Sequence, residues 1–494
     1  MVIPSKIDFS QIIKNGKIPP LYKEIPYLSP CLLYEPLSSP NSFLLESVKG
    51  PAKIARYSFI GFEPCLIFTS KNGFITIESK GKKTIFSGRP LNKLKELVQA
   101  YKQNSFEYLP PFQGGIIGLF GYDFVHYFER LPKNAVDDIN LPDAHFLMID
   151  KLIAIDHLHK KCWIIACPGV KDSVEGEGAS RKVDWSEKYD KAEYEIEKIL
   201  RKVTDTNPKS KIQNPKSNQK IKIIYEMKKN EYMDIVKKTK EYIAAGDIFQ
   251  ANLSQRVSAH IKDKSPWSLY RMLKSINPSP FAAFIDFGNY QIVSSSPERL
   301  LRVKDRKIET RPIAGTRPRG RDNKENELMR SELLLNEKER AEHIMLIDLE
   351  RNDLGRVSDY GTVRVDELMI TEDYSHVIHI VSNVIGSLAA GKDCFDAIKA
   401  ASPGGTITGV PKVRCMEIID ELEPVRRGPY TGSIGYISFS GNMDLNIVIR
   451  TFVINDGIAY VQAGAGIVAD SDPEREYYET LKKAEALIKT LEMV

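Results

Sequence analysis

Residues 294–320, SSSPERLLRVKDRKIETRPIAGTRPRG, hold the features around which the rest of the chain is organised. Glu298 follows a Ser-Pro step, and residues 307–312 have the pattern of a strand that leads to a Gly-Thr turn at Gly315. Sixteen positions separate Glu298 from Ala314, which predicts a hairpin whose two ends meet at one cavity. Glycine lets the main chain approach a ligand closely, so N–H groups near Gly315 can bind a compact anion. The same residues also fit an ordinary hairpin with a surface glutamate.

The composition is that of a globular protein with an ordinary balance of residues. At 494 residues the chain can bury a large core, and a net charge of only +5 indicates neither nucleic acid nor a membrane surface as partner. The six cysteines form no C-x-x-C pair, which predicts free thiols in a reducing compartment. The first residues lack the layout of a signal peptide, and no apolar run has the length of a membrane span. The sequence therefore predicts a cytoplasmic protein.

Composition also divides the chain into three parts. Residues 1–205 alternate short strand patterns with turns and form a predicted α+β region. Residues 206–220 are rich in Lys, Asn, Ser and Pro, with the tetrapeptide NPKS at Asn207 and again at Asn214. Because so few apolar residues cannot offset the entropy of ordering, we predict a flexible polar linker there. Residues 221–494 form the predicted catalytic domain.

Hydrophobic periodicity predicts the elements of these parts. Helical spacing predicts helices over 91–101, 185–203, 228–245, 324–348 and 474–493. Alternating or continuous apolar runs predict strands at 31–34, 42–47, 57–60, 66–69, 74–77, 114–119, 147–156 and 249–257, and at the start of 369–386.

Glu46 and Ser47 end one of the apolar strands of the first part. A carboxylate and a hydroxyl at a strand end could bind an amine-bearing ligand, although a strand that meets a polar turn has the same pattern.

Four polar groups in the second half stand in apolar or glycine-rich surroundings. Glu342 lies on a helix with apolar neighbours, so its carboxylate is expected to face inward, where it needs a partner or a metal. Glu479 lies on the last predicted helix, on one face with Glu476 and Lys483, a pattern also typical of a solvated salt-bridged face. His379 has apolar neighbours and is equally compatible with a core histidine.

The fourth group is the glycine-rich stretch 402–414, which precedes a helix but is not a P-loop. With Tyr430, Arg450 and the glycines of 463–466, these groups can form one site. Two carboxylates can hold Mg²⁺, which prefers oxygen ligands. Arg450 can bind the carboxylates of a dianionic substrate, and Glu298 and His379 remain for acid–base chemistry.

Many of these stretches resemble the chorismate-utilising enzyme family, which includes anthranilate synthase component I, aminodeoxychorismate synthase component I, isochorismate synthase and salicylate synthase. The resemblance implies an α+β fold with a two-sheet antiparallel β-sandwich core flanked by helices, and an N-terminal α+β region of the regulatory type. It covers the second half densely, and the first half through LLES and ARYSFIG. The similar stretches include SPERL, RPIAGTRPRG, EHIMLIDLERNDLGRV, YSHVIHIVSNV, GGTITGVPK, MEIIDELEPVRRGPYTG, SGNMDLNIVIRT and GAGIVADSDPE.

The resemblance also implies a set of roles. Glu298 would be the general acid for the leaving C4 hydroxyl of chorismate, with His379 near the ring. Mg²⁺ would be held by Glu342 and Glu479. The predicted contacts of chorismate are Thr316, Tyr430, Arg450, Gly464 and Gly466, with Gly315 beside them.

Two positions bear on the branch of the family. Isochorismate and salicylate synthases have a water-activating lysine where this chain has Gln250. The best-known aminodeoxychorismate synthases have a nucleophilic lysine where this chain has Ala314, which cannot form a covalent adduct. Both positions favour direct addition of ammonia at C2 with elimination of pyruvate, as in anthranilate synthase.

Other features favour other readings. QANLSQR and SGNMDLNI are closer to the aminodeoxychorismate branch, which aminates C4. In relatives that tryptophan inhibits, the resemblance implies that Glu46 and Ser47 would bind this amino acid. NPSPFAAF lacks the tyrosine-methionine pair of those relatives, so inhibition by tryptophan stays an open question. A catalytically inactive amino-acid sensor is a further alternative. No cysteine stands in a glycine-flanked nucleophile elbow, which predicts a separate glutamine amidotransferase subunit as the ammonia source.

Overall fold

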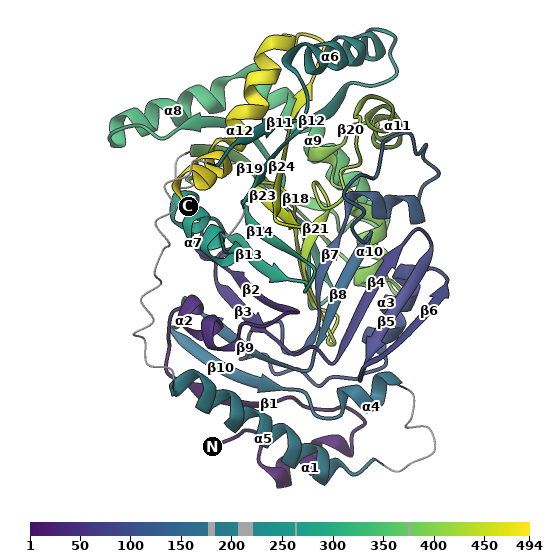
Figure 1. Ribbon diagram of the computed structural model, residues 1–494, viewed down its shortest axis with the longest axis vertical. Helices are drawn as coiled ribbons and strands as arrows, with labels where there is room; N and C mark the ends of the chain where they lie inside the picture. Colours follow the sequence, from purple (N-terminus) through teal and green to yellow (C-terminus); the bar gives the residue numbers. More distant parts are fainter. Residues whose placement is uncertain (176–182, 206–220, 262–263, 374–376) are drawn as a thin grey trace.

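Two antiparallel β-sheets face each other in the computed structural model of the protein, with helices on their outer faces (Figure 1). The structure describes residues 1–175, 183–205, 221–261, 264–373 and 377–494. The predicted linker 206–220 lies outside these residues. Among the helices described, none combines the length and the hydropathy of a membrane span.

The first sheet has 12 strands within the described residues. Their spatial order is β1 (Leu21–Ile25), β10 (Lys161–Ala166), β9 (Lys151–Asp156), β3 (Tyr57–Gly61), β2 (Ser42–Glu46), β13 (Phe281–Asp286), β14 (Tyr290–Ser296), β23 (Thr451–Asn455), β24 (Ile458–Ile467), β12 (Gln250–His260) and β11 (Ile223–Tyr225), with β20 (Gly409–Val410) also beside β12.

The second sheet likewise has 12 strands in the described part of the chain. Their order is β17 (Ile313–Pro318), β19 (Val377–Ser387), β16 (Lys307–Thr310), β15 (Arg299–Lys304), β22 (Met443–Ile447), β21 (Ser433–Ser438), β7 (Gly115–Phe120), β8 (Ala144–Ile149), β4 (Leu66–Lys71), β5 (Phe74–Ser79) and β6 (Lys82–Ser87), with β18 (Arg364–Asp373) also beside β19.

Both sheets contain strands from before and after residues 206–220. In the first sheet β2 pairs with β13, and in the second β7 pairs with β21. The three-part division of the sequence stays a prediction about its organisation, because the sheets are continuous across it. The two-sheet fold itself is confirmed.

The sandwich interior is apolar because facing strands turn large side chains toward each other. Buried aromatic and aliphatic residues from both sheets, such as Phe59 and Tyr436, pack at its centre with ring centroids 5.3 Å apart. Burial of this apolar area is the main term that holds the sheets together.

Helices cover the outer face of the first sheet. The helix α5 (Trp185–Thr204) begins at Asp184, whose side chain accepts from two backbone amides, and packs on β1 and β10 with α1 (Lys6–Ile13) beside it. The helices α2 (Pro30–Tyr34), α7 (Pro266–Ile276) and α12 (Pro473–Met493) pack further along this face, and α6 (Lys229–Ala244) lies against α12.

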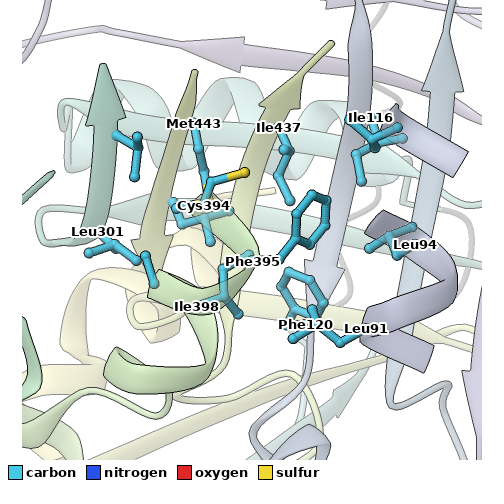
Figure 2. Close-up of a cluster of buried hydrophobic side chains, with 14 of the residues drawn as sticks. Leu91, Leu94, Ile116, Phe120, Leu301, Cys394, Phe395, Ile398, Ile437 and Met443 are labelled. Atoms are coloured by element: carbon cyan, nitrogen blue, oxygen red, sulfur yellow. The ribbon is translucent and has the colours of Figure 1, made fainter. Parts of the chain in front are cut away.

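The second sheet is covered by helices from both halves of the chain. Figure 2 shows Leu91 and Leu94 of α3 (Pro90–Gln99) and Phe395 of α10 (Cys394–Ala401) among the side chains of the strands. The remaining elements are α4 (Val170–Glu175), α8 (Asn323–Leu335), α9 (Glu337–Gly355), α11 (Lys412–Leu422), η1 (Glu35–Leu37), η2 (Tyr122–Tyr127) and η3 (Gly405–Ile407).

Three of the predicted helices and strands differ from the structure. Residues 31–34 belong to a helix because Pro30 stands at its first turn, where proline is favoured. The predicted helix 324–348 is two helices, since Asn336 is extended with ψ 108° and caps the second. The predicted strand 147–156 is two strands in different sheets.

Candidate active site

The candidate site lies where the chain passes from one sheet to the other at two neighbouring places. Glu298 lies between β14 of the first sheet and β15 of the second, and Arg450 lies between β22 of the second and β23 of the first. The Ile447 amide donates to the Glu298 carbonyl oxygen over 3.0 Å, and the Ser295 amide donates to the Arg450 carbonyl oxygen over 3.1 Å. Both residues are therefore fixed by the backbone of adjacent crossings.

The Glu298 side chain is buried and held by two donors. Thr406 Oγ1 donates to Oε1 over 3.0 Å, and the Ile313 amide also hydrogen-bonds the carboxyl group. Burial nevertheless dominates and raises the pKa of Glu298 to about 8. Glu298 is thus a neutral carboxylic acid at neutral pH, with a proton to give.

The two ends of segment 298–314 do meet, because the donor Ile313 immediately precedes Ala314. The predicted turn at Gly315 is wrong: this residue lies inside β17, at a bulge between Ala314 and Thr316. Its φ is +60°, and a Cβ there would lie 2.3 Å from Glu339 Oε2. The bulge therefore favours glycine, because L side chains rarely adopt this backbone conformation and a Cβ would displace the Glu339 side chain of α9.

His379 of β19 lies opposite Thr316 of β17. Its Nδ1 is 3.1 Å from the Gly315 carbonyl oxygen and 3.1 Å from Thr316 Oγ1. Because a carbonyl oxygen only accepts, Nδ1 carries the hydrogen and Nε2 keeps its lone pair. Burial, the largest cause, lowers the pKa of His379 to about 4, so the ring is neutral.

Arg450 is a half-buried cation with φ +54°. Within the described residues its guanidinium has no hydrogen-bond or ion-pair partner. Burial lowers its pKa, an effect opposed by Tyr430, Glu298 and Glu479. The Tyr430 ring is buried, and burial raises the pKa of its hydroxyl to about 12. An unpaired arginine in partly apolar surroundings has the chemistry to bind an anion.

Two glycines of β24 leave space for side chains of the neighbouring strand. A Cβ at Gly464 would lie 2.5 Å from Asn252 Oδ1 and 2.9 Å from the Tyr430 hydroxyl, and one at Gly466 would lie 2.3 Å from Gln250 Nε2. Gln250 Oε1 and Asn252 Oδ1 are buried without a partner in the described part of the chain. Two amide acceptors therefore lie beside the anion site.

The predicted metal ligands lie on different helices. Glu342 is half-buried on α9, and Glu479 on α12 is exposed, with Oε1 2.7 Å from Lys483 Nζ. The described residues contain no cluster of three His, Cys, Asp or Glu side chains suited to a metal. Carboxylate oxygens are nevertheless the donors that Mg²⁺ takes, with water and substrate as its other ligands, so the chemistry of this pair fits the ion.

Glu46 and Ser47 line a separate pocket with Tyr57, Phe281 and Tyr436. Glu46 is buried and accepts from the Tyr270 hydroxyl over 2.5 Å and from Lys274 Nζ over 2.6 Å. The Ser47 hydroxyl donates to the Tyr57 carbonyl oxygen over 2.8 Å. Both polar groups already have protein partners, so an amine ligand would have to share or replace them.

Sequence reasoning missed two residues of the site, Thr406 and Asn252. Thr406 belongs to the glycine-rich stretch 402–414, which the sequence pattern indicates as the start of a helix. Nothing in that pattern indicates that Thr406 hydrogen-bonds Glu298. Asn252 is two positions from Gln250 on β12, and period-two alternation would have placed it on the same face.

Comparisons with known proteins show the family to which the chain belongs. The family model "chorismate binding enzyme" matches residues 41–489, and the chain belongs to this family of chorismate-binding enzymes. It is 47% identical to anthranilate synthase component 1 of Acetivibrio thermocellus, covering 91% of this chain and 90% of that protein. It is 42% identical to aminodeoxychorismate synthase component 1 of Bacillus subtilis, covering 96% and 97%.

A solved structure has the same architecture. The crystal structure of anthranilate synthase component I from Streptococcus pneumoniae TIGR4 matches with a TM-score of 0.77 and 34% identity, over 94% of this chain and 99% of that chain.

Proposed function

We propose that this chain is the chorismate-aminating component of an anthranilate synthase. The observation that carries the proposal is the unpaired guanidinium of Arg450 beside the neutral acid Glu298, at two crossings joined by backbone hydrogen bonds. A ring that carries carboxylates and a poor leaving group needs these two functions together, an anion receptor and a proton donor.

In this proposal Arg450 binds a carboxylate of chorismate, with the Tyr430 hydroxyl beside it. Glu298 gives its proton to the C4 hydroxyl, which leaves as water while ammonia adds at C2. The intermediate then loses its C2 proton and the enolpyruvyl group as pyruvate, and the ring becomes aromatic. His379, neutral and with Nε2 unprotonated, is suited to accept a proton near the ring.

Glu342 and Glu479 would hold Mg²⁺. When bound, the ion neutralises substrate carboxylate charge and so favours charge build-up as the hydroxyl leaves.

Ala314 supports the anthranilate branch. It stands next to Ile313, whose amide hydrogen-bonds Glu298, and its methyl group offers no amine for attack at C2. Gln250 offers an amide where water activation needs a base. The second candidate, amination at C4 as an aminodeoxychorismate synthase does, is favoured by the similarity to the Bacillus subtilis protein.

Ammonia would come from a glutamine amidotransferase subunit. The relatives are named component 1, and the thiols in this chain are free and mostly buried. Binding of tryptophan at the Glu46 pocket is a separate proposal, tested by adding L-tryptophan to the assay.

The test is incubation of the purified chain with chorismate, Mg²⁺ and ammonium at alkaline pH, with chromatographic identification of the products. Anthranilate with equimolar pyruvate is expected. Aminodeoxychorismate without pyruvate would move the chain to the other branch. Absence of any turnover in the presence of a folded protein would favour the inactive sensor.

A further inference from the structure

Glu350 is a buried acid that lies close to the candidate site. The proposed reaction gives it no role. It lies on α9 with 3% of its surface exposed, and Oε2 has no hydrogen-bond partner among the described residues. The Thr310 hydroxyl and the Gly405 amide hydrogen-bond the carboxyl group. A buried carboxyl with so few partners strongly favours its neutral form.

Two segments, residues 310–313 and residues 405–406, each hydrogen-bond both Glu350 and Glu298. In the first, Thr310 hydrogen-bonds Glu350 and the Ile313 amide hydrogen-bonds Glu298. In the second, the Gly405 amide hydrogen-bonds Glu350, and the hydroxyl of the adjacent Thr406 hydrogen-bonds Glu298. Each segment therefore gives one donor to each acid.

The segment of Gly405 and Thr406 packs closely against α9. A Cβ at Gly405 would lie 2.2 Å from Leu349 Cδ2 and 3.6 Å from Glu350 Oε1, so glycine permits the contact. The helix α9 packs directly against this loop, so the relative positions of the two acids are fixed by packing as well as by hydrogen bonds.

The charges around the pair are few. On the side of Glu350, Asp353 of α9 is ion-paired with Lys412 of α11, and both act on Glu350. On the side of Glu298, Lys483 of α12 and Arg450 lie within electrostatic reach. Burial raises the pKa of Glu350 to about 7, and a charge on Glu350 further raises that of Glu298.

We propose that Glu350 is a positioning residue for the acid Glu298: the two buried carboxyl groups, held by shared segments, act as one unit that accepts a single negative charge. When one is ionised, repulsion in a medium of low polarity keeps the proton on the other. Glu350 thereby extends to higher pH the range in which Glu298 can protonate a leaving group. The inference rests on the proposed role of Glu298.

The first test is the pH dependence of kcat/KM for chorismate with ammonium. In Glu350→Gln, which cannot be charged, the alkaline limb is expected to move to lower pH by about one unit. The matched control is Asp348→Asn, which removes one charge from the exposed face of the same helix and should leave the limb in place. Superimposable profiles for Glu350→Gln and wild type, or equal shifts in both variants, would overturn the proposal.

The second test does not depend on activity. Infrared difference titration of the full chain follows the band of protonated carboxyl groups in wild type, Glu350→Gln and Glu298→Gln. Wild type should lose this signal in two coupled steps, and each variant should keep one step at lower pH than the upper step of wild type. Unshifted single steps would show that the acids are independent.

The two tests separate the failure of each proposal. If the wild-type protein does not turn over chorismate but the two acids titrate in a coupled way, the proposed function is refuted. The coupling of Glu298 and Glu350 would still stand. If Glu350→Gln does not fold, Glu350→Met replaces it, because methionine has a similar volume and cannot be charged, although it gives up the hydrogen bonds from Thr310 and Gly405.

Discussion

Ser296 and Ile447 clamp the two crossings together: the Ser296 hydroxyl donates to the Ile447 carbonyl oxygen over 2.6 Å. The Ile447 amide in turn donates to the Glu298 carbonyl oxygen over 3.0 Å. Movement of Glu298 away from Arg450 would break bonds that also join the sheets. The proposed acid Glu298 and the proposed anion receptor Arg450 are therefore held in fixed positions, which is the condition for electrostatic catalysis.

Glu298→Gln should bind chorismate but lose the proton donor. We expect kcat to fall on the order of 10²–10⁴-fold with little change in KM. Steady-state kinetics with ammonium measure both constants. A variant with unchanged kcat would show that another group protonates the leaving hydroxyl.

The same substitution has a pH-dependent effect on stability. Between its ordinary value of 4.5 and about 8, Glu298 keeps a proton in the folded protein that the unfolded chain releases. The wild-type free energy of unfolding therefore falls as pH rises through this window. The Tm of Glu298→Gln relative to wild type should rise from about pH 5 to about pH 9, and a constant difference would contradict the raised pKa.

Arg450→Gln should weaken chorismate binding. Loss of a charge-assisted contact corresponds to roughly 10- to 100-fold in kcat/KM. The control is Arg351→Gln, whose exposed side chain pairs with Asp348 on α9. Equal affinity of Arg450→Gln and wild type for chorismate, by calorimetry, would remove Arg450 from the site.

Ala314→Lys should slow anthranilate formation, roughly tenfold, because the longer side chain enters the space beside C2. Product analysis distinguishes slow amination at C2 from a change of branch. The same product at the same rate would mean that position 314 does not face the substrate.

Glu342→Gln and Glu479→Gln should each raise the Mg²⁺ concentration needed for half-maximal activity, about tenfold or more. Glu479 is exposed and its pair with Lys483 contributes little, so Tm should change hardly at all. Glu485→Gln, on the exposed face of α12, is the control. Equal Mg²⁺ dependence in all three variants would refute the metal assignment.

Sequence patterns predicted fewer than half of the described strands, among them β2, β3 and β12, and most of the long helices, because burial on one or two faces gives a period that can be recognised in the sequence. The exceptions follow from local signals that outweigh it. Pro30 starts a helix in an apolar run, and Asn336 ends one helix and caps the next. Such single residues act through φ, ψ and capping, which periodicity does not register.

The structure brings several of the predicted site residues together, but the contacts that join them could not be predicted from the sequence. Glu298, His379 and Arg450 were singled out, yet nothing in their spacing indicated that two sheet crossings lie side by side. Thr406 and Glu350 became visible only through contacts between segments far apart in the chain. Long-range contacts of this kind leave no local pattern.

Each sheet is completed by strands from both sides of residues 206–220, with β2 joined to β13 and β7 to β21. Without the other half, β2 and β7 of the first half and β13 and β21 of the second would become unpaired sheet edges, so the halves are not exchangeable parts. A chimera that took one half from a relative would have to match the other at both seams, and fragments produced separately should gain structure only when mixed.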